Sequence, residues 1–351
     1  MVDKSEAISI VGAGAWGCAL AQSHARAQSL PSTQSLLSAP PQSHADRPVW
    51  LWARSQDVVD EINTRRTNAR RLAGIAIAPN VTATTELETA LSANVILLAT
   101  PAQQARTIAR RMAPLLGARH IVINCAKGLE QSTGHLVGDV LAEELPTIRI
   151  ATLSGPGFAD DLARGLPAAL TLGCRDETLG LALAERLSHP GLRLYWTADS
   201  RGVELGGAVK NVLAIAAGIL DGKGLGGSAH AALVTRGFAE MRRLADAVGA
   251  RPETMHGLSG LGDLILTCGS ARSRNFSLGQ ALGRGEALTD ILAGRSAVTE
   301  GVYTAAAVAR LSAQHTVEMP ISRAVHAILD GNLSVEAAIA GLLARPIKAE
   351  D

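Results

Sequence analysis

The sequence predicts an α/β protein in which an N-terminal parallel-sheet domain is followed by a C-terminal all-helical domain. Up to about residue 198, short apolar runs alternate with helical stretches, a pattern typical of βαβ units with right-handed crossovers. Beyond that point, long Ala-, Leu- and Gly-rich helical segments continue to the C-terminus. At 351 residues the chain has room for two ordinary domains. We therefore predict domains over residues 1–197 and 198–351.

The expected strands of the first domain are short runs dominated by β-branched and other apolar residues. In chain order they are "AISIV", "VWLWAR", "NVILLAT", "HIVINCAKG", "IRIATLSGPG" and "AALTLGC". Between the first helix and the second strand, residues 28–47 are rich in Ser, Gln and Pro and cannot hold a helix or a central strand. We expect a flexible surface loop there, which the chemistry does not need.

Composition restricts the class of partner and the compartment. The formal net charge is +1, and no Lys/Arg block or aromatic ladder suggests nucleic-acid binding, so the expected partner is a small molecule. The longest apolar run, "VLAIAAGIL", is half a membrane span, and the first apolar segment begins too early for a signal peptide. We expect no stable membrane insertion. The four cysteines lie far apart with no CxxC pair, which predicts reduced thiols, no metal site and a cytoplasmic enzyme.

A glycine-rich turn, "GAGAWG", lies between the first strand and the first helix. Gly12, Gly14 and Gly17 are in the G-x-G-x-x-G frame, where they permit a tight turn, close approach to a pyrophosphate and packing of helix on strand. In this position the pattern indicates a Rossmann-type dinucleotide site. The alternative is a glycine-rich turn with no ligand. Trp16, within the turn, either flanks the cofactor or caps the fold.

The end of the second strand bears on the choice of cofactor. An NAD-specific domain is expected to have Asp or Glu there, hydrogen-bonded to the ribose 2′-OH, but this chain has Arg54. A guanidinium can pair with a 2′-phosphate, so we predict that NADP(H) is preferred and that NAD(H) is also used. Alternatively, Arg54 is a surface arginine whose stem stacks on adenine.

Two further motifs follow predicted strands. "NCAKGLE" places Lys127 just past the carboxyl end of a strand, where open α/β sheets bind ligands. In "SGPG", Gly155 and Gly157 flank a proline and give backbone N–H groups close access to a substrate or nicotinamide. A plain tight turn is the alternative for the second motif.

The densest polar stretch lies in the second domain. Asp263 follows a glycine turn, and Ser273, Arg274 and Asn275 precede an apolar periodic run that resembles a helix entry. Ser, Arg and Asn beside free helix N–H groups can surround a phosphate. The alternative is a simple N-cap, which Ser or Asn could provide but which needs no arginine.

A series of motifs follows in order along nearly the whole chain: "VGAGAWG", "AKGLE", "SGPGFA", "GVELGGAVKN", "AALVTRG", "GLGDLILTC", "SRN", "VTEGV" and "EMPI". With these motifs the chain resembles one family, the NAD(P)-dependent glycerol-3-phosphate dehydrogenases of the bacterial type. The resemblance implies reversible reduction of dihydroxyacetone phosphate to sn-glycerol 3-phosphate for glycerophospholipid synthesis. It also implies a homodimer.

The resemblance assigns the acid/base to Lys210 of "GAVKN". Burial in an apolar helix disfavours an ammonium and lowers its pKa toward the operating pH, which suits that role. The alternative is a structural lysine that reaches for the surface, but Gly206, Gly207, Ala208 and Ala214 offer no polar face. The resemblance implies these substrate-binding residues: Lys127, Gly155, Gly157, Asn211, Asp263, Thr267, Ser273, Arg274 and Asn275. With the turn and Arg54, it implies this cofactor site: Gly12, Gly14, Ala15, Trp16, Gly17, Arg54, Lys127, Ala159, Arg274, Val298 and Glu300.

The chain departs from the family pattern in four places. Ala15 and Gly157 replace hydroxyl residues, Gly227 and Ser228 replace Asp-Asn, and the loop over 28–47 is longer. Two rival functions remain. A β-hydroxyacid dehydrogenase would pair its helix lysine with an Asn four residues later, where this chain has Ala214. A non-catalytic NADP sensor would not need Lys210 or the "SRN" stretch.

Overall fold

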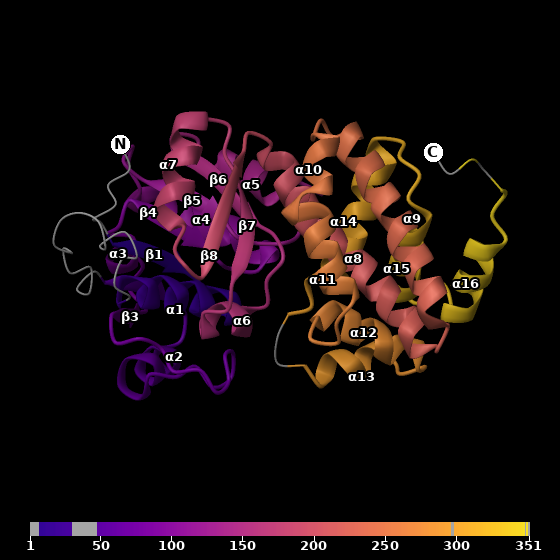
Figure 1. Cartoon of the computed structure of the whole chain (residues 1–351), viewed down its shortest axis with the longest axis horizontal. Helices are drawn as coiled ribbons and strands as arrows, with labels where there is room; N and C mark the ends of the chain where they lie inside the picture. The colour runs from indigo at the N-terminus through magenta and orange to yellow at the C-terminus, as the bar shows by residue number, and fades with distance from the viewer. Residues whose placement is uncertain (1–6, 30–47, 296–297, 348, 350–351) are drawn as a thin grey trace. The chain divides into compact units, whose positions relative to one another are not determined.

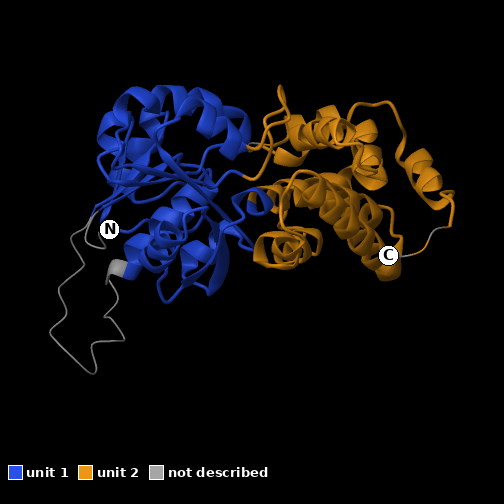
Figure 2. Ribbon diagram, turned by 90° about the horizontal axis from the view of Figure 1, so that it is seen from above, with its two compact units in different colours: residues 1–126, 137–203 blue, residues 127–136, 204–351 orange. Residues whose placement is uncertain are grey.

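The computed structural model describes residues 7–29, 48–295, 298–347 and 349, and the chain divides into two compact units (Figure 1, Figure 2). Unit 1 comprises residues 1–126 and 137–203, and unit 2 comprises 127–136 and 204–351. The main boundary falls after residue 203, six residues beyond the predicted boundary after residue 197, and the short segment 127–136 groups with the helical unit, which was not predicted. Its Leu129 and Leu136 are buried in the hydrophobic core of unit 2.

Unit 1 contains one eight-stranded sheet with the order β3-β2-β1-β4-β5-β6-β7-β8. The first six strands are parallel, as predicted, but β7 runs antiparallel to β6, so the sheet is mixed. All six predicted strands are confirmed, whereas β3 and β8, the two edge strands, were not predicted. The strand bounds are β1 Ile8–Val11, β2 Val49–Trp52, β3 Val81–Thr84, β4 Val95–Leu98, β5 Ile121–Asn124, β6 Arg149–Ser154, β7 Ala168–Gly173 and β8 Leu192–Thr197.

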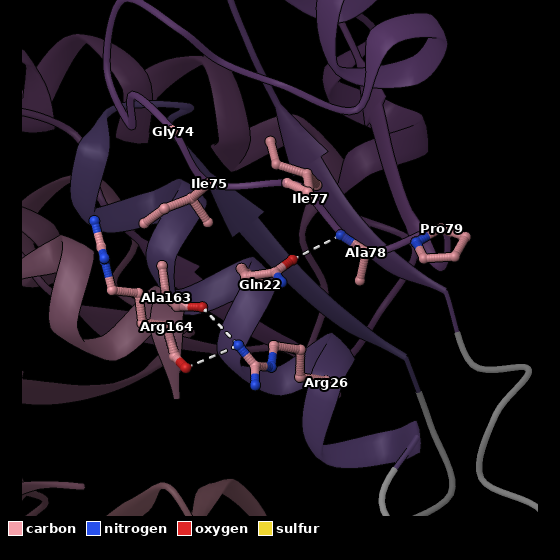
Figure 3. Close-up of a pocket in the computed structure, with 10 residues that line it drawn as sticks. Gln22, Arg26, Gly74, Ile75, Ile77, Ala78, Pro79, Ala163 and Arg164 are labelled. Atoms are coloured by element: carbon pink, nitrogen blue, oxygen red, sulfur yellow. Dashed lines mark hydrogen bonds between the residues drawn. The ribbon is translucent and has the colours of Figure 1, made fainter. Parts of the chain in front are cut away.

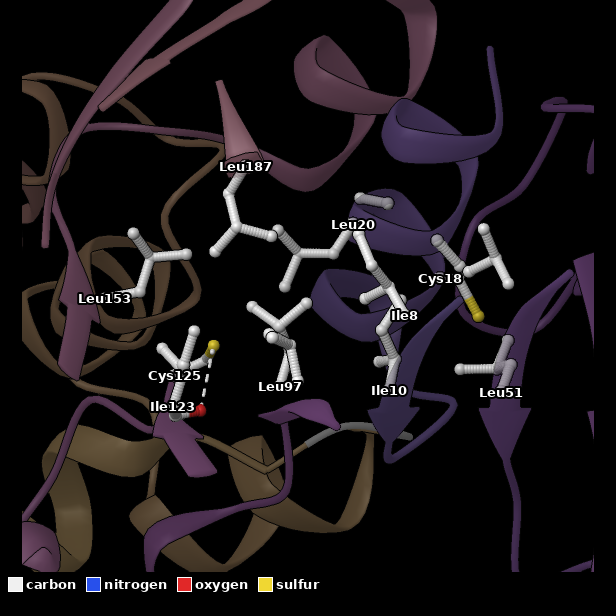
Figure 4. Close-up of a cluster of buried hydrophobic side chains, with 14 of the residues drawn as sticks. Ile8, Ile10, Cys18, Leu20, Leu51, Leu97, Ile123, Cys125, Leu153 and Leu187 are labelled. Carbon is white, nitrogen blue, oxygen red and sulfur yellow. Dashed lines mark hydrogen bonds between the residues drawn. The ribbon is translucent and has the colours of Figure 1, made fainter. Parts of the chain in front are cut away.

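Helices cover both faces of this sheet, which explains why its inner strands are apolar at nearly every position. Successive side chains of β4 alternate between two clusters: Leu97 packs with Leu20 of α1 and Leu187 of α7 (Figure 4), and Leu98 packs with Met112 of α4. The helix bounds are α1 Ala15–Ser29, α2 Gln56–Asp60, α3 Leu87–Ala90, α4 Ala105–Met112, α5 Val137–Glu144, α6 Ala159–Arg164 and α7 Glu177–Leu187, with short π and 3₁₀ turns at Glu61–Arg65, Ala102–Gln104 and Ala113–Leu115.

Two minor expectations can be compared with this unit. Helix α1 extends to Ser29, so the predicted loop over 28–47 is wrong at its first two residues, and the rest of it lies outside the described residues. The four cysteines, two of which lie in the core of Figure 4, are all free and buried, which confirms the predicted thiols.

The regular elements of unit 2 are all helical within its described residues, as predicted. Its bounds are α8 Ser200–Gly222, α9 Gly226–Ala247, α10 Pro252–His256, the π-helix η6 Leu258–Gly262, α11 Asp263–Cys268, α12 Arg274–Gly283, α13 Leu288–Ala293, α14 Glu300–Gln314, α15 Pro320–Leu329 and α16 Val335–Leu343. Helix α8 is long and apolar enough to cross a membrane by length and composition, but 94% of its most apolar window is buried inside the protein. That burial is typical of the core helix of a folded domain.

Helices α8 and α12 touch backbone to backbone through glycines. Gly218 and Gly222 of α8 face Gly279 and Gly283 of α12, and each pair is spaced four residues apart so that both members lie on one face. A Cβ at Gly279 would lie 2.1 Å from the carbonyl oxygen of Ile215, far inside van der Waals contact. Only glycine therefore permits this crossing, which holds α12 against the helix that carries Lys210.

We expect Gly279→Ala to lower the free energy of unfolding by about 1–3 kcal/mol, because the added methyl group must push the two helices apart. Thermal unfolding measures the change. The matched control is Gly341→Ala in α16, where a new Cβ would meet nothing within 4 Å. Alanine is the better helix former by roughly 0.5–1 kcal/mol, so the control should be neutral or slightly stabilising. Equal melting temperatures for Gly279→Ala and wild type would contradict the close crossing.

Candidate active site

The glycine-rich turn of unit 1 has the geometry that a bound pyrophosphate needs. Gly12 has a φ of +119°, and a Cβ there would lie 2.7 Å from the carbonyl oxygen of Ala99. A Cβ at Gly17 would lie 1.9 Å from the carbonyl oxygen of Gly12, so α1 packs directly on the turn. Around Gly14, in contrast, a Cβ would meet nothing within 4 Å. The backbone is thus open where a phosphate would approach, and α1 begins at the next residue, Ala15, so its N-terminus could hold the anion.

The "SGPG" turn after β6 packs against this motif. Gly155 has a φ of +146°, and a Cβ there would lie 3.0 Å from Cα of Leu170, so the turn requires glycine. A Cβ at Gly157 would lie 3.2 Å from the indole ring of Trp16. Gly157 therefore lies against Trp16, which gives a steric reason for its departure from the hydroxyl residues of the family pattern. Ala159 begins α6 just beyond this turn.

Arg54 is exposed two residues after β2. It therefore lies at the carboxyl end of a parallel strand next to β1, where a Rossmann domain binds the adenosine ribose. Both interpretations of Arg54, the 2′-phosphate partner and the adenine stack, fit this placement.

The two lysines singled out in the sequence share one carboxylate in unit 2. Lys210 Nζ donates to Asp263 Oδ1 at 2.7 Å and to Thr267 Oγ1 at 2.7 Å. Lys127 Nζ donates to Asp263 Oδ2, also at 2.7 Å. Asp263 and Thr267 are four residues apart in α11, so both side chains lie on one face of that helix. The site is deeply buried, with side-chain exposures of 8% for Lys210 and 1% for Asp263.

Burial lowers the pKa of Lys210 to about 8, with the Asp263 carboxylate opposing this shift and the Lys127 ammonium adding to it. The alternative in which Lys210 reaches solvent is wrong. A lysine with this pKa can both give and take a proton near neutral pH, which an exposed lysine at its usual pKa does poorly.

Two asparagines connect the lysines to the rest of unit 2. Asn211 Nδ2 donates to the carbonyl oxygen of Lys127 at 2.8 Å, and Asn275 Nδ2 donates to Asn211 Oδ1 at 2.9 Å. Asn275 Oδ1 in turn accepts the backbone N–H of Gly301 at 3.0 Å. These bonds hold the backbone of Lys127 in place, and the substrate contacts expected of both amide side chains stay predictions.

The "SRN" stretch opens α12. Ser273 is its N-cap and accepts the backbone N–H of Phe276 at 3.3 Å, so the simple N-cap interpretation describes this side chain. Arg274 is exposed and donates from Nη1 to the carbonyl oxygen of Val298 at 2.6 Å. Two residues predicted for the cofactor site therefore lie together, with Glu300 starting α14 two residues later. The departures Gly227 and Ser228 are exposed in the first turn of α9.

A cavity of about 500 Å³ in unit 1 lies apart from these motifs (Figure 3). It is lined by Gln22 and Arg26 of α1, residues 74–79, and Ala163 and Arg164 of α6. Arg26 donates to the carbonyl oxygens of both α6 residues. None of the predicted site residues lines this cavity.

Comparison with known proteins accounts for both units. A family model described as the NAD-dependent glycerol-3-phosphate dehydrogenase N-terminus matches residues 7–180, and the model of the C-terminus matches residues 199–340. The chain belongs to the NAD-dependent glycerol-3-phosphate dehydrogenase family. The resemblance seen in the sequence motifs is thus confirmed, together with the oxidoreductase class.

Individual members of the glycerol-3-phosphate dehydrogenase family match the chain over nearly its whole length. A protein named glycerol-3-phosphate dehydrogenase (NAD(P)+) from Parvibaculum lavamentivorans is 49% identical over 343 residues, 98% of each chain. The protein of that name from Caulobacter vibrioides is 50% identical over 345 residues, which is 98% of this chain and 99% of that one. The crystal structure of glycerol-3-phosphate dehydrogenase from Coxiella burnetii superposes with a TM-score of 0.88 at 37% identity, covering 98% of this chain and 100% of that chain.

Proposed function

We propose that this protein catalyses the reversible NAD(P)H-dependent reduction of dihydroxyacetone phosphate to sn-glycerol 3-phosphate, for glycerophospholipid synthesis. The observation that carries the proposal is the buried Lys210, bonded to Asp263 and Thr267, in a member of this enzyme family. The nicotinamide cofactor, when bound, supplies the hydride that reaches C2 of the substrate.

Lys210 delivers the proton that this reduction requires. An ammonium group has three N–H donors, of which Asp263 and Thr267 each accept one. The third is left for the C2 oxygen of the substrate, so the two protein contacts orient the remaining proton. Asp263 favours the charged form of Lys210, which keeps the acid loaded near neutral pH.

Charge supports a phosphorylated substrate. Lys127, Asp263 and Lys210 together carry two positive charges and one negative, a net surplus of one cation. Arg274 adds an exposed guanidinium at the N-terminus of α12, which suits a phosphate dianion. Gly155 and Gly157 remain proposed substrate contacts through their backbone N–H groups. Ser273 also remains one, because its hydroxyl oxygen accepts the cap hydrogen bond while its O–H can donate to a phosphate.

We propose that NADP(H) is the preferred cofactor and that NAD(H) is also used. Arg54→Ala should raise KM for NADPH about tenfold, the size expected for one charge-assisted contact, and change KM for NADH little. The matched control is Arg175→Ala, another exposed arginine just past a strand. Because β7 runs antiparallel to β6, the carboxyl end of β7 lies at the amino ends of the parallel strands. Arg175 therefore lies at the end of the sheet opposite to Arg54. An equal effect of Arg54→Ala on both cofactors would show that this arginine stacks on adenine.

We also propose a cytoplasmic homodimer, on the resemblance to the family and the composition of the chain. Sedimentation of the purified protein tests the dimer, because a single species at the monomer mass would contradict it.

The function is tested by following nicotinamide absorbance when the purified protein is mixed with dihydroxyacetone phosphate, in parallel runs with NADPH and NADH. Consumption that depends on the phosphorylated triose is the expected result. Binding of NADPH without any consumption would contradict the proposal and favour a β-hydroxyacid substrate or a cofactor sensor.

A further inference from the structure

Arg295 lies between α13 and α14 and donates hydrogen bonds to the first turn of α12. It is not one of the predicted site residues. Its Nη1 donates to the carbonyl oxygen of Arg274 at 2.7 Å, and its Nη2 donates to Ser277 Oγ at 3.1 Å. Ser277 Oγ itself donates to the same carbonyl oxygen at 3.2 Å. The planar guanidinium thus spans one turn of the helix with two bonds, a geometry that a lysine could not reproduce.

A second arginine contact lies beside the first. Arg274 donates from Nη1 to the carbonyl oxygen of Val298, and Arg295 donates to the carbonyl oxygen of Arg274. We call this pair of arginine contacts the clasp. One residue further along α12, Asn275 Oδ1 accepts the backbone N–H of Gly301. This bond connects the first turn of α12 to the first turn of α14.

The clasp brings the positively charged side chains of Arg274 and Arg295 close together. Partial burial and the neighbouring Arg274 both lower the pKa of Arg295, and Glu286 opposes that shift. Glu286, however, is already bonded to Arg284 through two N–H groups, at 3.0 and 2.8 Å. Two adjacent guanidinium groups therefore stand at the N-terminus of a ten-residue helix, whose own dipole is positive at that end. Such an arrangement favours an anion.

We propose that Arg295 is a positioning residue for phosphate binding: it holds the backbone of Arg274 so that the Arg274 guanidinium is presented to the substrate phosphate. This inference rests on the proposed function. Without the clasp, Arg274 must be ordered each time substrate binds, and that ordering reduces affinity. Among the described residues, the hydrogen bonds that hold Lys210 and Lys127 at Asp263 do not involve Arg295. We therefore expect Arg295 to affect substrate binding and not proton transfer.

The test compares steady-state kinetics of Arg295→Ala, Arg295→Lys and the control Arg284→Ala. Arg284 is an arginine at the other end of the same helix, exposed and bonded to Glu286. We expect Arg295→Ala to raise KM for dihydroxyacetone phosphate about tenfold or more, the size of a lost charged hydrogen bond, with kcat within about twofold. Arg295→Lys keeps the charge without the fork and should recover only part of the loss. Arg284→Ala should match wild type.

Unphosphorylated dihydroxyacetone separates positioning from general damage. Its kcat/KM should be the same for wild type and Arg295→Ala, because its binding uses no phosphate contact, while the inhibition constant of inorganic phosphate should rise in the variant. An unchanged KM for dihydroxyacetone phosphate, or equal losses with both substrates, would overturn the proposal. Direct calorimetry of phosphate binding gives the same comparison without turnover. A wild-type protein inert toward dihydroxyacetone phosphate would instead refute the proposed function.

Discussion

Lys210→Ala is expected to lower kcat for reduction of dihydroxyacetone phosphate by about 10²–10⁴, the usual contribution of a positioned general acid. Removal of the amine takes away the proton donor that Asp263 and Thr267 orient, and neither of these two groups, a carboxylate and a neutral hydroxyl, can replace it. Stopped-flow or steady-state kinetics with NADPH measure the loss of kcat. Titration of cofactor fluorescence should show NADPH binding retained, because Lys210 belongs to unit 2 and the glycine turn to unit 1. Wild-type rates in this variant would remove Lys210 from the role of acid.

The pH dependence of the wild-type enzyme gives an independent test of the same role. Reduction needs the Lys210 ammonium, so its rate should fall as the pH rises through about 8, the lowered pKa of this group. Oxidation of sn-glycerol 3-phosphate needs the neutral amine, so its rate should fall as the pH drops through the same value. Profiles measured in both directions should therefore cross near pH 8. Two profiles with the same limb would contradict a single shared acid/base.

Asp263→Asn is expected to damage both stability and turnover. The substitution leaves two buried or half-buried ammonium groups without their common carboxylate, and breaking a buried ion pair typically costs about 3–5 kcal/mol. Because Asp263 raises the pKa of Lys210, its loss should lower that pKa further and move the reduction profile to lower pH. At neutral pH less of the acid would be charged, so reduction slows.

The free energy of unfolding of Asp263→Asn should also depend on pH. In Asp263→Asn the buried Lys210 binds its proton less readily in the folded chain than in the unfolded chain, so the stability of the variant should rise with pH. Thermal unfolding at several pH values measures this trend. The matched control is Asp139→Asn, a partly exposed carboxylate paired with Arg201 in unit 1, where about 0–1 kcal/mol is expected. Equal unfolding curves for Asp263→Asn and wild type would show that the carboxylate does not balance the lysines.

Several parts of this protein could be predicted from local sequence because they depend on local periodicity. Apolar runs such as "NVILLAT" are strands because both faces of the sheet are covered, and that requirement is written into consecutive residues. The turn at Gly12 and Gly17 was likewise predictable, because at both positions a side chain would collide with neighbouring backbone atoms. Edge strands β3 and β8 were missed because they are half-exposed and carry a weaker pattern.

The sequence by itself determined the two-domain α/β architecture, the dinucleotide turn and, through family motifs, the identity of Lys210. Only the tertiary structure decided which groups surround that lysine. Asp263 lies 53 residues from Lys210 and 136 from Lys127, and Arg295 lies 21 residues from Arg274. No spacing rule joins positions so far apart, because helix and strand periods report only which face of one element a residue occupies. The pKa of Lys210 and the clasp on Arg274 arise from contacts between segments that are distant in the sequence, and these contacts exist only in the folded chain.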